Sequence, residues 1–404
     1  MKITETSTSE SPVATGITSQ TTPATSNPLL SRSFEKSAQN LFCFSHLRWN
    51  FVYQRPQHLL SRASKQWRIW FIEEPIWGNE LKVEVRAIND HLNVVVPHVK
   101  HGTPGQDVLA YQRRVVDQLL ESERITDFMA WYYTPMALEF TDHLKPQLTI
   151  YDCMDELSAF LGAPPQLIEQ EKRLMQQADI VFTGGYSLYE AKQTRHPRVF
   201  AFPSSIDYNH FCQARRPLPD PTDQRSLPNP RVGFCGVIDE RFDCGLFAEL
   251  AQRRSDWQFV LLGPTVKVDP ACLPKASNIH YLGMKTYQEL PAYFSNWDVA
   301  MMPFALNEST RFISPTKTPE YLSAGLPVVS TPIRDVVRTY GSAGHVQIAD
   351  DAKAFEQAIE AALLGRHPAN WEAIDGFLAE NSWDKTWSDM ARIMQGHLQL
   401  VTEQ

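Results

Sequence analysis

Residues 314–330 read SPTKTPEYLSAGLPVVS, and this stretch predicts a short helix followed at once by a strand. A Ser or Thr cap followed by Pro in the first turn favours the start of a helix. Gly325 is suited to end that helix, because glycine readily adopts the left-handed conformation that follows a last turn. Residues 327–331 then form a short apolar run of the kind found in buried strands.

The first turn of this helix contains three residues that are candidates for binding a nucleotide diphosphate, namely Thr316, Lys317 and Glu320. Free N–H groups and the positive end of the helix dipole attract anions, and Lys317 adds a mobile cation suited to a diphosphate. Glu320 lies one turn further on, where it can accept hydrogen bonds from a ribose diol. We expect both charged side chains to be exposed. The spacing alone also fits a plain helix-to-strand connection.

Short apolar runs that suit β-strands alternate with longer helical stretches, which is typical of parallel sheets covered by helices. In the first half of the chain the predicted strands are 40–45, 68–73, 92–99, 127–133, 148–152, 179–183 and 199–203. In the second half they are 231–238, 258–263, 279–283, 298–304, 327–331 and 345–348. Two α/β domains are therefore predicted, and such domains bind ligands at the carboxyl ends of their strands.

Two segments of unusual composition mark the predicted domain boundaries. Residues 1–38 are crowded with Ser, Thr and Pro, which predicts a disordered tail. Residues 213–230 contain five prolines and almost no apolar periodicity, which predicts an extended linker. The predicted domains are 39–212 and 231–381, and a chain of 404 residues is long enough for two such cores.

Composition and charge exclude several classes of protein. The net charge of −8 argues against a nucleic-acid binder, because such proteins concentrate positive charge. No apolar run reaches the ~18 residues of a membrane-spanning helix. No Gly-x-Gly-x-x-Gly follows a predicted strand, which excludes a nicotinamide dehydrogenase. The six cysteines lie far apart without metal-ligand spacing, so we expect reduced thiols, no metal and a cytoplasmic protein.

Several segments resemble the retaining glycosyltransferases of family four, also called glycosyltransferase group one. Residues 320–330, EYLSAGLPVVS, are similar to the donor-binding signature in which a Glu holds the nucleotide ribose. Residues 176–183, QQADIVFT, and 202–211, FPSSIDYNHF, look like the segments that end the family's N-terminal domain. Residues 152–158, DCMDELS, together with 314–317, SPTK, resemble a teichuronic-acid-type subgroup.

This resemblance implies the GT-B architecture, in which two Rossmann-like, doubly wound α/β domains face a central cleft. Residues 382–404 would form a terminal helix that crosses back to the N-terminal domain, because Ser382-Trp383 is similar to the start of that helix. The implied activity is the transfer of a sugar, with retention, from a nucleotide-diphosphate-sugar donor to a glycan, lipid-linked or other acceptor. Such reactions build cell-surface polysaccharides or glycoconjugates, and the family's donor site needs no metal.

The chain departs from the family at two positions. Phe312 stands where the family usually carries a second Glu, with Glu308 further upstream, and Met154 replaces a His that commonly touches the donor sugar. A non-catalytic nucleotide-sugar-binding partner is therefore an alternative, and a sugar-nucleotide epimerase on the same fold is the closest enzymatic alternative. Epimerisation or hydrolysis of the donor without an acceptor would indicate the epimerase, and donor binding without turnover would indicate the binding partner.

Loops that follow predicted strands supply the remaining candidate residues. His46 and Arg48, after the first strand, are candidate catalytic residues that would position the acceptor or a phosphate. Asp155 matches the Asp of the family's His-Asp pair and is a candidate general base or acceptor-orienting carboxylate. It is also suited to cap the turn at 156–160. Arg241 is suited either to clamp the donor diphosphate or to pair with a neighbouring aspartate.

Five basic residues and no acidic residue occur between positions 48 and 68 of this acidic chain, namely Arg48, Arg55, Arg62, Lys65 and Arg68. The run predicts either a solvated face or a patch that contacts anionic lipid or a lipid-phosphate acceptor. A peripheral contact with the inner face of the membrane is one prediction from this pattern.

Overall fold

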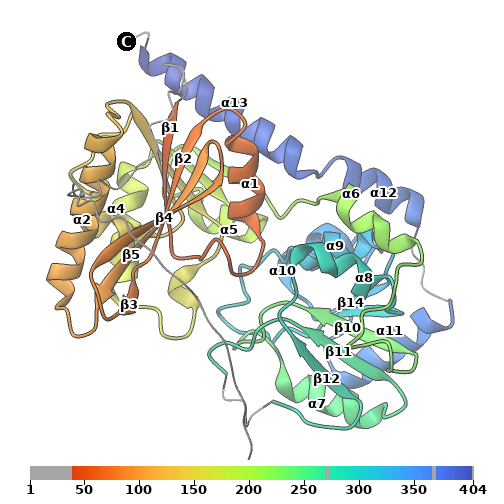
Figure 1. The fold of residues 1–404 in the computed structure, drawn as a ribbon. Helices are drawn as coiled ribbons and strands as arrows, with labels where there is room; N and C mark the ends of the chain where they lie inside the picture. The colour runs from red at the N-terminus through yellow and green to blue at the C-terminus, as the bar shows by residue number, and fades with distance from the viewer. Residues whose placement is uncertain (1–38, 269–270, 272, 366–369, 403–404) are drawn as a thin grey trace, which may run out of the picture. The chain divides into compact units, whose positions relative to one another are not determined.

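Two parallel β-sheets, each flanked by helices, make up the protein (Figure 1). The structure is a computed structural model that describes residues 39–268, 271, 273–365 and 370–402. The predicted tail, residues 1–38, lies outside the described residues. The described cysteines Cys43, Cys153, Cys212, Cys235 and Cys244 are free thiols.

The first sheet runs in the order β3-β5-β2-β1-β6-β7-β8-β9, with β4 paired antiparallel to β5 and the other neighbours parallel. Its strands are β1 (Asn40–Ser45), β2 (Arg68–Glu73), β3 (Ile76–Gly78), β4 (Lys82–Asn89), β5 (Leu92–Lys100), β6 (Phe128–Tyr132), β7 (Leu148–Cys153), β8 (Ile180–Thr183) and β9 (Val199–Ala201). The chain order reverses between β1 and β6, so the loops that follow these strands diverge and leave a crevice for a ligand.

The second sheet is parallel throughout and runs in the order β12-β11-β10-β13-β14-β15. Its strands are β10 (Arg231–Cys235), β11 (Gln258–Leu262), β12 (Ile279–Gly283), β13 (Val299–Met302), β14 (Val328–Ser330) and β15 (Gln347–Ile348). Here the order reverses between β10 and β13. Both sheets are therefore doubly wound, as the sequence predicts, and each has one topological switch point.

Helices accompany both sheets (Figure 1). Those of the first are α1 (Arg55–Ala63), α2 (Gly105–Ser122), α3 (Leu138–Thr141), α4 (Gln166–Gln177) and α5 (Tyr186–Lys192). The later ones are α6 (Tyr208–Phe211), α7 (Cys244–Arg253), α8 (Leu290–Phe294), α9 (Lys317–Ser323), α10 (Arg334–Val336), α11 (Ala352–Leu363), α12 (Trp371–Ala379) and α13 (Trp383–Thr402).

Every predicted strand is present within a few residues of its predicted bounds. Two further strands, β3 and β4, were not predicted. In β4 charged residues alternate with Val83 and Val85, which are 38% and 40% exposed. Because this outermost strand buries little apolar surface, it lacks the continuous apolar run by which central parallel strands are recognised.

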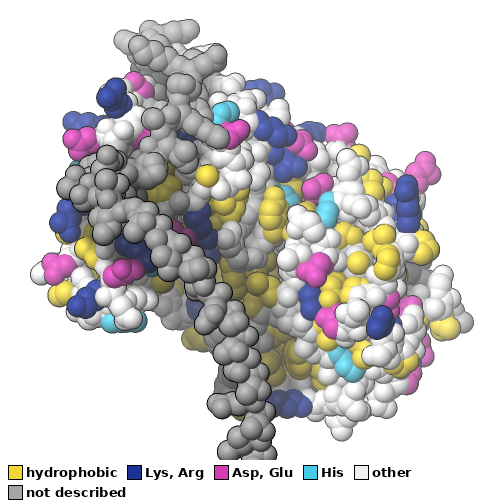
Figure 2. All heavy atoms as spheres, in the orientation of Figure 1, with side chains coloured by type: hydrophobic (Ala, Val, Ile, Leu, Met, Phe, Trp, Pro, Cys, Tyr) yellow, Lys and Arg dark blue, Asp and Glu magenta, His cyan; other side chains and the backbone are white. Residues whose placement is uncertain are grey.

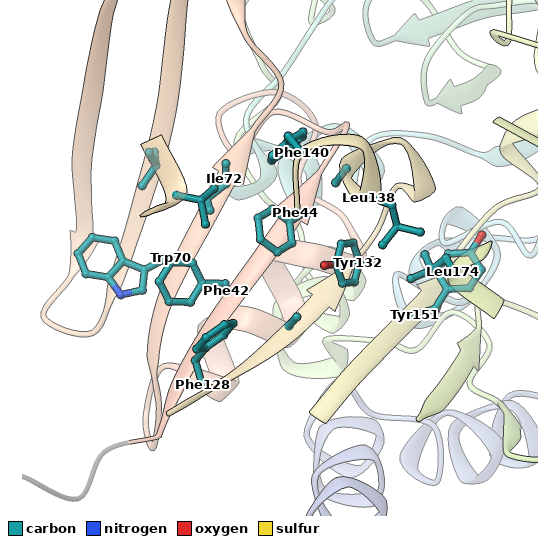
Figure 3. Packing of buried hydrophobic residues seen from close by; sticks show 14 of the residues in the cluster. Phe42, Phe44, Trp70, Ile72, Phe128, Tyr132, Leu138, Phe140, Tyr151 and Leu174 are labelled. Atoms are coloured by element: carbon teal, nitrogen blue, oxygen red, sulfur yellow. The ribbon is translucent and has the colours of Figure 1, made fainter. Parts of the chain in front are cut away.

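Buried aromatic side chains dominate the core on one face of the first sheet. Figure 3 shows Phe42, Phe44, Trp70, Phe128 and Tyr132 side by side along three neighbouring strands. The rings of Phe44 and Tyr132 are stacked with centroids 5.0 Å apart. A second core covers the opposite face, so β1 is buried on both sides and its carboxyl end is held rigidly.

The C-terminal helix α13 packs on this second core of the first domain. Trp383, Trp387, Met390 and Met394 are buried there, and α13 lies beside α1 (Figure 1). The chain passes from the first domain to the second near Ile206 and returns near Ser382, the residue before α13. A parallel β-bridge joins these two residues. The last helix therefore belongs by packing to the first domain, although it follows the second in sequence.

The proline-rich segment 213–230 is fastened to the second domain. Gln224 is fully buried, and its side chain accepts a hydrogen bond from Nε1 of Trp297 at 3.1 Å. Asp220 pairs with Arg231 at 2.7 Å. After the 3₁₀ helix Cys212–Arg215, which overlaps its start, this connection has no regular helix or strand, and these side-chain contacts help to hold it in place.

Candidate active site

A cavity of about 140 Å³ lies at the carboxyl ends of strands from both sheets. The loops after β1, β7, β8 and β9 contribute from one side. Those after β10 and β13, the two strands at the switch point of the second sheet, contribute from the other. This main cavity is lined by Val52, Tyr53, Gln54, Arg55, Met154, Asp155, Gly184, Ser204, Phe234, Cys235, Gly236, Val237, Arg241, Phe304, Ile313, Ser314, Pro315, Thr316 and Lys317.

Three carboxylates lie at and just after the end of β7, and each has a different environment. Asp152 is fully buried and pairs with Arg55, the first residue of α1, at 2.9 Å. Glu156 pairs with the buried Lys192 of α5 at 2.6 Å. Asp155 lies between these two ion-paired residues and lines the main cavity. Of the three, Asp155 is therefore the carboxylate available to a substrate.

Asp155 has the electrostatic properties of a base. Burial raises the pKa of Asp155 to about 6, although Arg241 and Arg55 favour its charged form. Such a carboxyl is mostly ionised at neutral pH and accepts a proton more readily than an ordinary aspartate. Glu156, and not Asp155, occupies the N-cap position of the short 3₁₀ helix Leu157–Ala159, which has no side-chain cap. The structure thus shows no capping role for Asp155.

Lys317 and Glu320 form a buried ion pair, with Nζ of Lys317 2.5 Å from Oε2 of Glu320. The prediction that both are exposed is wrong, because Lys317 is 9% and Glu320 3% exposed. Burial disfavours the charge of Lys317, but Glu320 more than compensates and raises the pKa of Lys317. Lys317 lines the main cavity and Glu320 is not among its lining residues, so the ribose role of Glu320 stays a prediction.

A hydrogen bond to the second sheet helps to fix the position of α9. The backbone N–H of Cys235, at the end of β10, donates to the hydroxyl of Tyr321 at 2.6 Å. Thr316 occupies the N-cap of α9 without forming a side-chain cap, and it lines the main cavity. Gly325, with φ of +82°, follows the helix in the left-handed conformation that the sequence predicts.

Arg241 lines the main cavity and is also ion-paired. Its Nη2 lies 2.6 Å from Oδ2 of Asp239, and its guanidinium lies 5.1 Å from the ring centroid of Phe160. The structure confirms the pairing of Arg241 with a neighbouring aspartate, which orients the guanidinium beside the cavity. The clamping of a diphosphate by Arg241 stays a prediction. Its positive charge also acts on Asp155.

The structure places His46 and Arg48, the other two candidate catalytic residues, in different surroundings. His46 lines a second pocket, and burial lowers the pKa of His46 to about 4, so its imidazole is neutral. Arg48 lines neither the main cavity nor the pocket of His46. Its guanidinium pairs with Glu73 at 3.1 Å and donates to the carbonyls of Glu74 and Pro75, which holds the turn after β2.

Two glycines that follow β8 allow close approaches at the site. A Cβ on Gly184 would lie 2.3 Å from the carbonyl oxygen of Met154, and one on Gly185 would lie 2.4 Å from Oδ2 of Asp335. Sequence analysis missed both, although a glycine pair directly after a predicted strand is a signal of such an approach. It also missed Arg55, whose partner Asp152 lies 97 residues away and leaves no local pattern.

Hydrogen bonds and ion pairs connect the two domains beside the main cavity. Asp335 is buried. Its carboxylate accepts a hydrogen bond from the backbone N–H of Ser187 at 3.1 Å and another from the Ser187 hydroxyl at 2.5 Å. Glu190 of α5 pairs with Arg334 at 2.7 Å and with Arg338 at 2.6 Å. These contacts hold α5 of the first domain against the region of α10 in the second.

The five basic residues of the 48–68 run do not form one free cationic patch. Arg48 pairs with Glu73, Arg55 with Asp152, Arg62 with Asp384 and Arg68 with Glu123, and Lys65 is exposed. On the face that Figure 2 shows, Lys and Arg side chains are scattered among Asp and Glu. The patch that the sequence suggested is therefore absent from the described structure, because distant acids neutralise four of its members.

The structure also bears on membranes and metals. Among the described residues, no helix combines the length and hydropathy needed to cross a bilayer. Within the same residues, no group of three His, Cys, Asp or Glu side chains is arranged to hold a metal ion. The expectation of a metal-free donor site stays a prediction.

Known proteins share both sequence and fold with this chain. Residues 229–364 match the model of the family described as Glycosyl transferases group 1. The Bacillus subtilis (strain 168) protein TuaH, named for glycosyl transfer in teichuronic acid biosynthesis, is 23% identical over 279 residues. That match covers 65% of this chain and 66% of TuaH, just under two thirds of the relative.

Solved structures extend the likeness over nearly the whole chain. A sucrose-phosphate synthase from Thermosynechococcus elongatus has a TM-score of 0.65 at 15% identity, covering 91% of this chain and 100% of that one. An E. coli trehalose-6-phosphate structure, bound with UDP-2-fluoro glucose, has a TM-score of 0.64 at 12% identity, with 88% and 99% covered. A trehalose-phosphate synthase from Burkholderia xenovorans, in complex with glucose-6-phosphate, scores 0.65 at 12% identity, with 89% and 100% covered.

Proposed function

We propose that this chain, a member of the group 1 glycosyltransferases with a GT-B fold, moves a sugar from a nucleotide-diphosphate-sugar donor to an acceptor hydroxyl. The observation that carries the proposal is the main cavity, which brings Asp155, Arg241 and Lys317 together at the carboxyl ends of strands from two doubly wound sheets. Two cations suit a diphosphate and one carboxylate suits a hydroxyl, so the cavity offers chemistry for both substrates.

The donor diphosphate is assigned to the side of the cavity formed by the second domain. Lys317 and Arg241 lie there, and each is held by a carboxylate, Glu320 or Asp239. Cations that are already oriented lose little freedom when an anion binds, which favours affinity. The E. coli neighbour bound with UDP-2-fluoro glucose supports a nucleotide-sugar donor for this fold.

In the proposed reaction an acceptor oxygen attacks the anomeric carbon of the donor sugar. A new C–O bond forms there, the bond from that carbon to the diphosphate oxygen breaks, and the nucleoside diphosphate leaves with the electron pair. Arg241 and Lys317 stabilise the charge that develops on the leaving group. Asp155 accepts the hydrogen bond of the attacking hydroxyl and takes its proton as the bond forms.

Retention of configuration and a role in polysaccharide synthesis are further parts of the proposal. Retention rests on the resemblance of residues 320–330 to the family-four signature. It requires the acceptor oxygen to attack the anomeric carbon on the same face from which the diphosphate leaves, because an in-line displacement would invert the configuration. The name of TuaH supports a cell-surface polysaccharide as the product, and a glycan or lipid-linked molecule is the corresponding acceptor. A cytoplasmic protein at the inner face of a membrane would meet both substrates.

The decisive experiment measures donor binding and turnover on the full chain. A panel of UDP- and GDP-sugars is screened by thermal shift, because a ligand at 100 times its dissociation constant stabilises by about 2.7 kcal/mol. Any donor that binds is then tested for nucleoside diphosphate release with and without acceptors. Stabilisation by one donor class and acceptor-dependent release are the expected results. Epimerisation of the donor, or binding without any release, would contradict the proposal.

Removal of Lys317, one of the two donor-side cations, should weaken nucleotide binding. Lys317→Ala is expected to cost roughly 1.5 to 3 kcal/mol in affinity for UDP or GDP, because a charge-assisted hydrogen bond to the diphosphate is lost. Calorimetric titration measures this directly. The variant should also be less stable, since Glu320 then keeps a buried charge without its partner.

The matched control for that variant is Lys317→Ala combined with Glu320→Gln. It removes the unpaired carboxylate, so stability should largely return while nucleotide affinity stays low. A folded Lys317→Ala protein that binds UDP and GDP as tightly as the wild type would place the diphosphate elsewhere.

A further inference from the structure

A second pocket, of about 360 Å³, adjoins the main cavity. The two share Gln54, Asp155, Val237 and Arg241, so a ligand in the second pocket would meet one in the main cavity at these side chains. The second pocket is lined by His46, Leu47, Phe51, Gln54, Glu74, Thr134, Met136, Asp155, Leu157, Phe160, Gly162, Ala163, Pro164, Leu167, Val237, Arg241 and Lys267. We call it the acceptor pocket.

One wall of the acceptor pocket is a segment rich in apolar residues. Residues 157–168 read LSAFLGAPPQLI and comprise the 3₁₀ helix Leu157–Ala159, a loop and the first turn of α4. Leu157, Phe160 and Leu167 from this segment line the pocket. Phe51, from the loop after β1, adds a large aromatic side chain that is 41% exposed. Accessible apolar side chains that gather at a cavity usually mark a surface that a ligand covers.

Contacts with the second domain hold this segment in place. The backbone N–H of Leu161 donates to Oε1 of Glu240 at 3.0 Å, and Nζ of Lys267 donates to the Leu161 carbonyl at 3.0 Å. Arg241 lies over the ring of Phe160. The apolar wall is thus fixed beside Asp155 by both domains, while the side chain of Leu161 stays 60% exposed.

The polar and apolar lining residues suit different parts of one ligand. A buried sugar hydroxyl needs a hydrogen-bond partner, and Asp155, Thr134 and His46 can supply such partners. Nδ1 of His46 is buried and has no hydrogen-bond partner among the described residues. The residues that line the pocket from segment 157–168 have no polar side-chain atoms, so their side chains offer a sugar ring no hydrogen-bond partner: Leu157, Phe160, Gly162, Ala163, Pro164 and Leu167.

We propose that the acceptor is an amphiphile, a glycoside or polyol whose apolar substituent packs against Phe51, Leu157 and Phe160. This inference rests on the proposed function, and it names the class of acceptor. The reacting hydroxyl lies at Asp155, where the two cavities meet. The apolar substituent extends away from the donor along the 157–168 segment, and burial of its methylene groups supplies binding free energy.

The test compares matched pairs of acceptors that differ only in the apolar substituent. Octyl and methyl glycosides of glucose, galactose and N-acetylglucosamine are used below the micelle concentration, with the donor that the thermal-shift screen identifies. Turnover is measured as nucleoside diphosphate release, and acceptor binding by calorimetry in the presence of UDP or GDP. The octyl member of a pair is expected to be favoured by about tenfold or more in kcat/KM or affinity.

Three variants locate the effect. Phe160→Ser and Leu157→Ser should each reduce the octyl preference several-fold. Leu157→Ser should leave nucleotide affinity and donor hydrolysis unchanged, whereas Phe160→Ser also removes the ring that packs on Arg241. Ile168→Ser is the matched control, because Ile168 is 66% exposed on α4 and does not line the acceptor pocket. It should keep the full octyl preference.

The possible outcomes distinguish failure of the amphiphilic acceptor from failure of the proposed function on which it rests. Equal turnover and equal binding of octyl and methyl glycosides, with nucleotide binding intact, would overturn the amphiphilic acceptor and leave the proposed function standing. An octyl preference that survives both Phe160→Ser and Leu157→Ser would also overturn it. Absence of nucleotide binding and of donor hydrolysis would contradict the proposed function itself, and this inference with it.

Discussion

Asp155→Asn is expected to lower turnover by about 10² to 10⁴, the usual contribution of general base catalysis, while donor affinity barely changes. The amide has nearly the shape of the carboxylate but cannot take a proton. Arg55 and Lys192 hold the segments on either side of Asp155 through ion pairs with Asp152 and Glu156, so the substitution should not displace the loop. Turnover, nucleotide affinity and melting temperature on this one variant test the assignment.

The same carboxylate predicts a pH dependence. Burial raises the pKa of Asp155 to about 6, so the carboxyl is protonated below that pH and ionised above it. Because the ionised form accepts the proton of the acceptor hydroxyl, turnover should rise as the pH increases through about 6. In Asp155→Asn this rise should disappear and leave a low, flat profile.

A control keeps the charge and changes its position. Asp155→Glu retains a carboxylate one methylene further out, so part of the turnover and a rise with pH should remain. Turnover in Asp155→Asn equal to that of the wild type would remove Asp155 from the mechanism.

The sequence predicts the parallel sheets well, because each central strand is an apolar run with sharp ends. Residues 40–45 and 68–73 coincide with β1 and β2. Interactions between distant residues were not predictable in this way. Arg62 reads as part of a basic patch until folding brings Asp384, 322 residues away, to within 3.0 Å.

The candidate site shows the same difference between local patterns, which the sequence reveals, and the effects of folding, which it does not. The SPTK segment and the acidic cluster were found, because local patterns and family resemblance mark them. Burial was not foreseen, and it changes their chemistry: Lys317 is locked to Glu320, and Asp155 alone of three carboxylates is left for a substrate. Arg48 follows the first strand as expected, yet it pairs with Glu73 and does not line the main cavity.

The buried ion pair between Arg55 and Asp152 should have the largest effect on stability. Nε of Arg55 lies 3.0 Å from both carboxylate oxygens of Asp152, and Nη1 donates to the carbonyl of Phe202 at 2.8 Å. One side chain thus joins the start of α1, the end of β7 and the segment after β9. These are three of the places from which the main cavity is built.

Asp152→Asn should therefore lower the free energy of unfolding by about 3 to 5 kcal/mol, because Arg55 keeps its charge without a compensating carboxylate. Urea unfolding at neutral pH measures the loss. Replacement of both residues, Arg55→Met with Asp152→Leu, removes the unpaired charge and should recover much of that stability. Turnover should not recover with it, because Arg55 no longer connects the three segments around Asp155. A single variant that loses less than about 1 kcal/mol would show that water or another group reaches Arg55 and screens its charge.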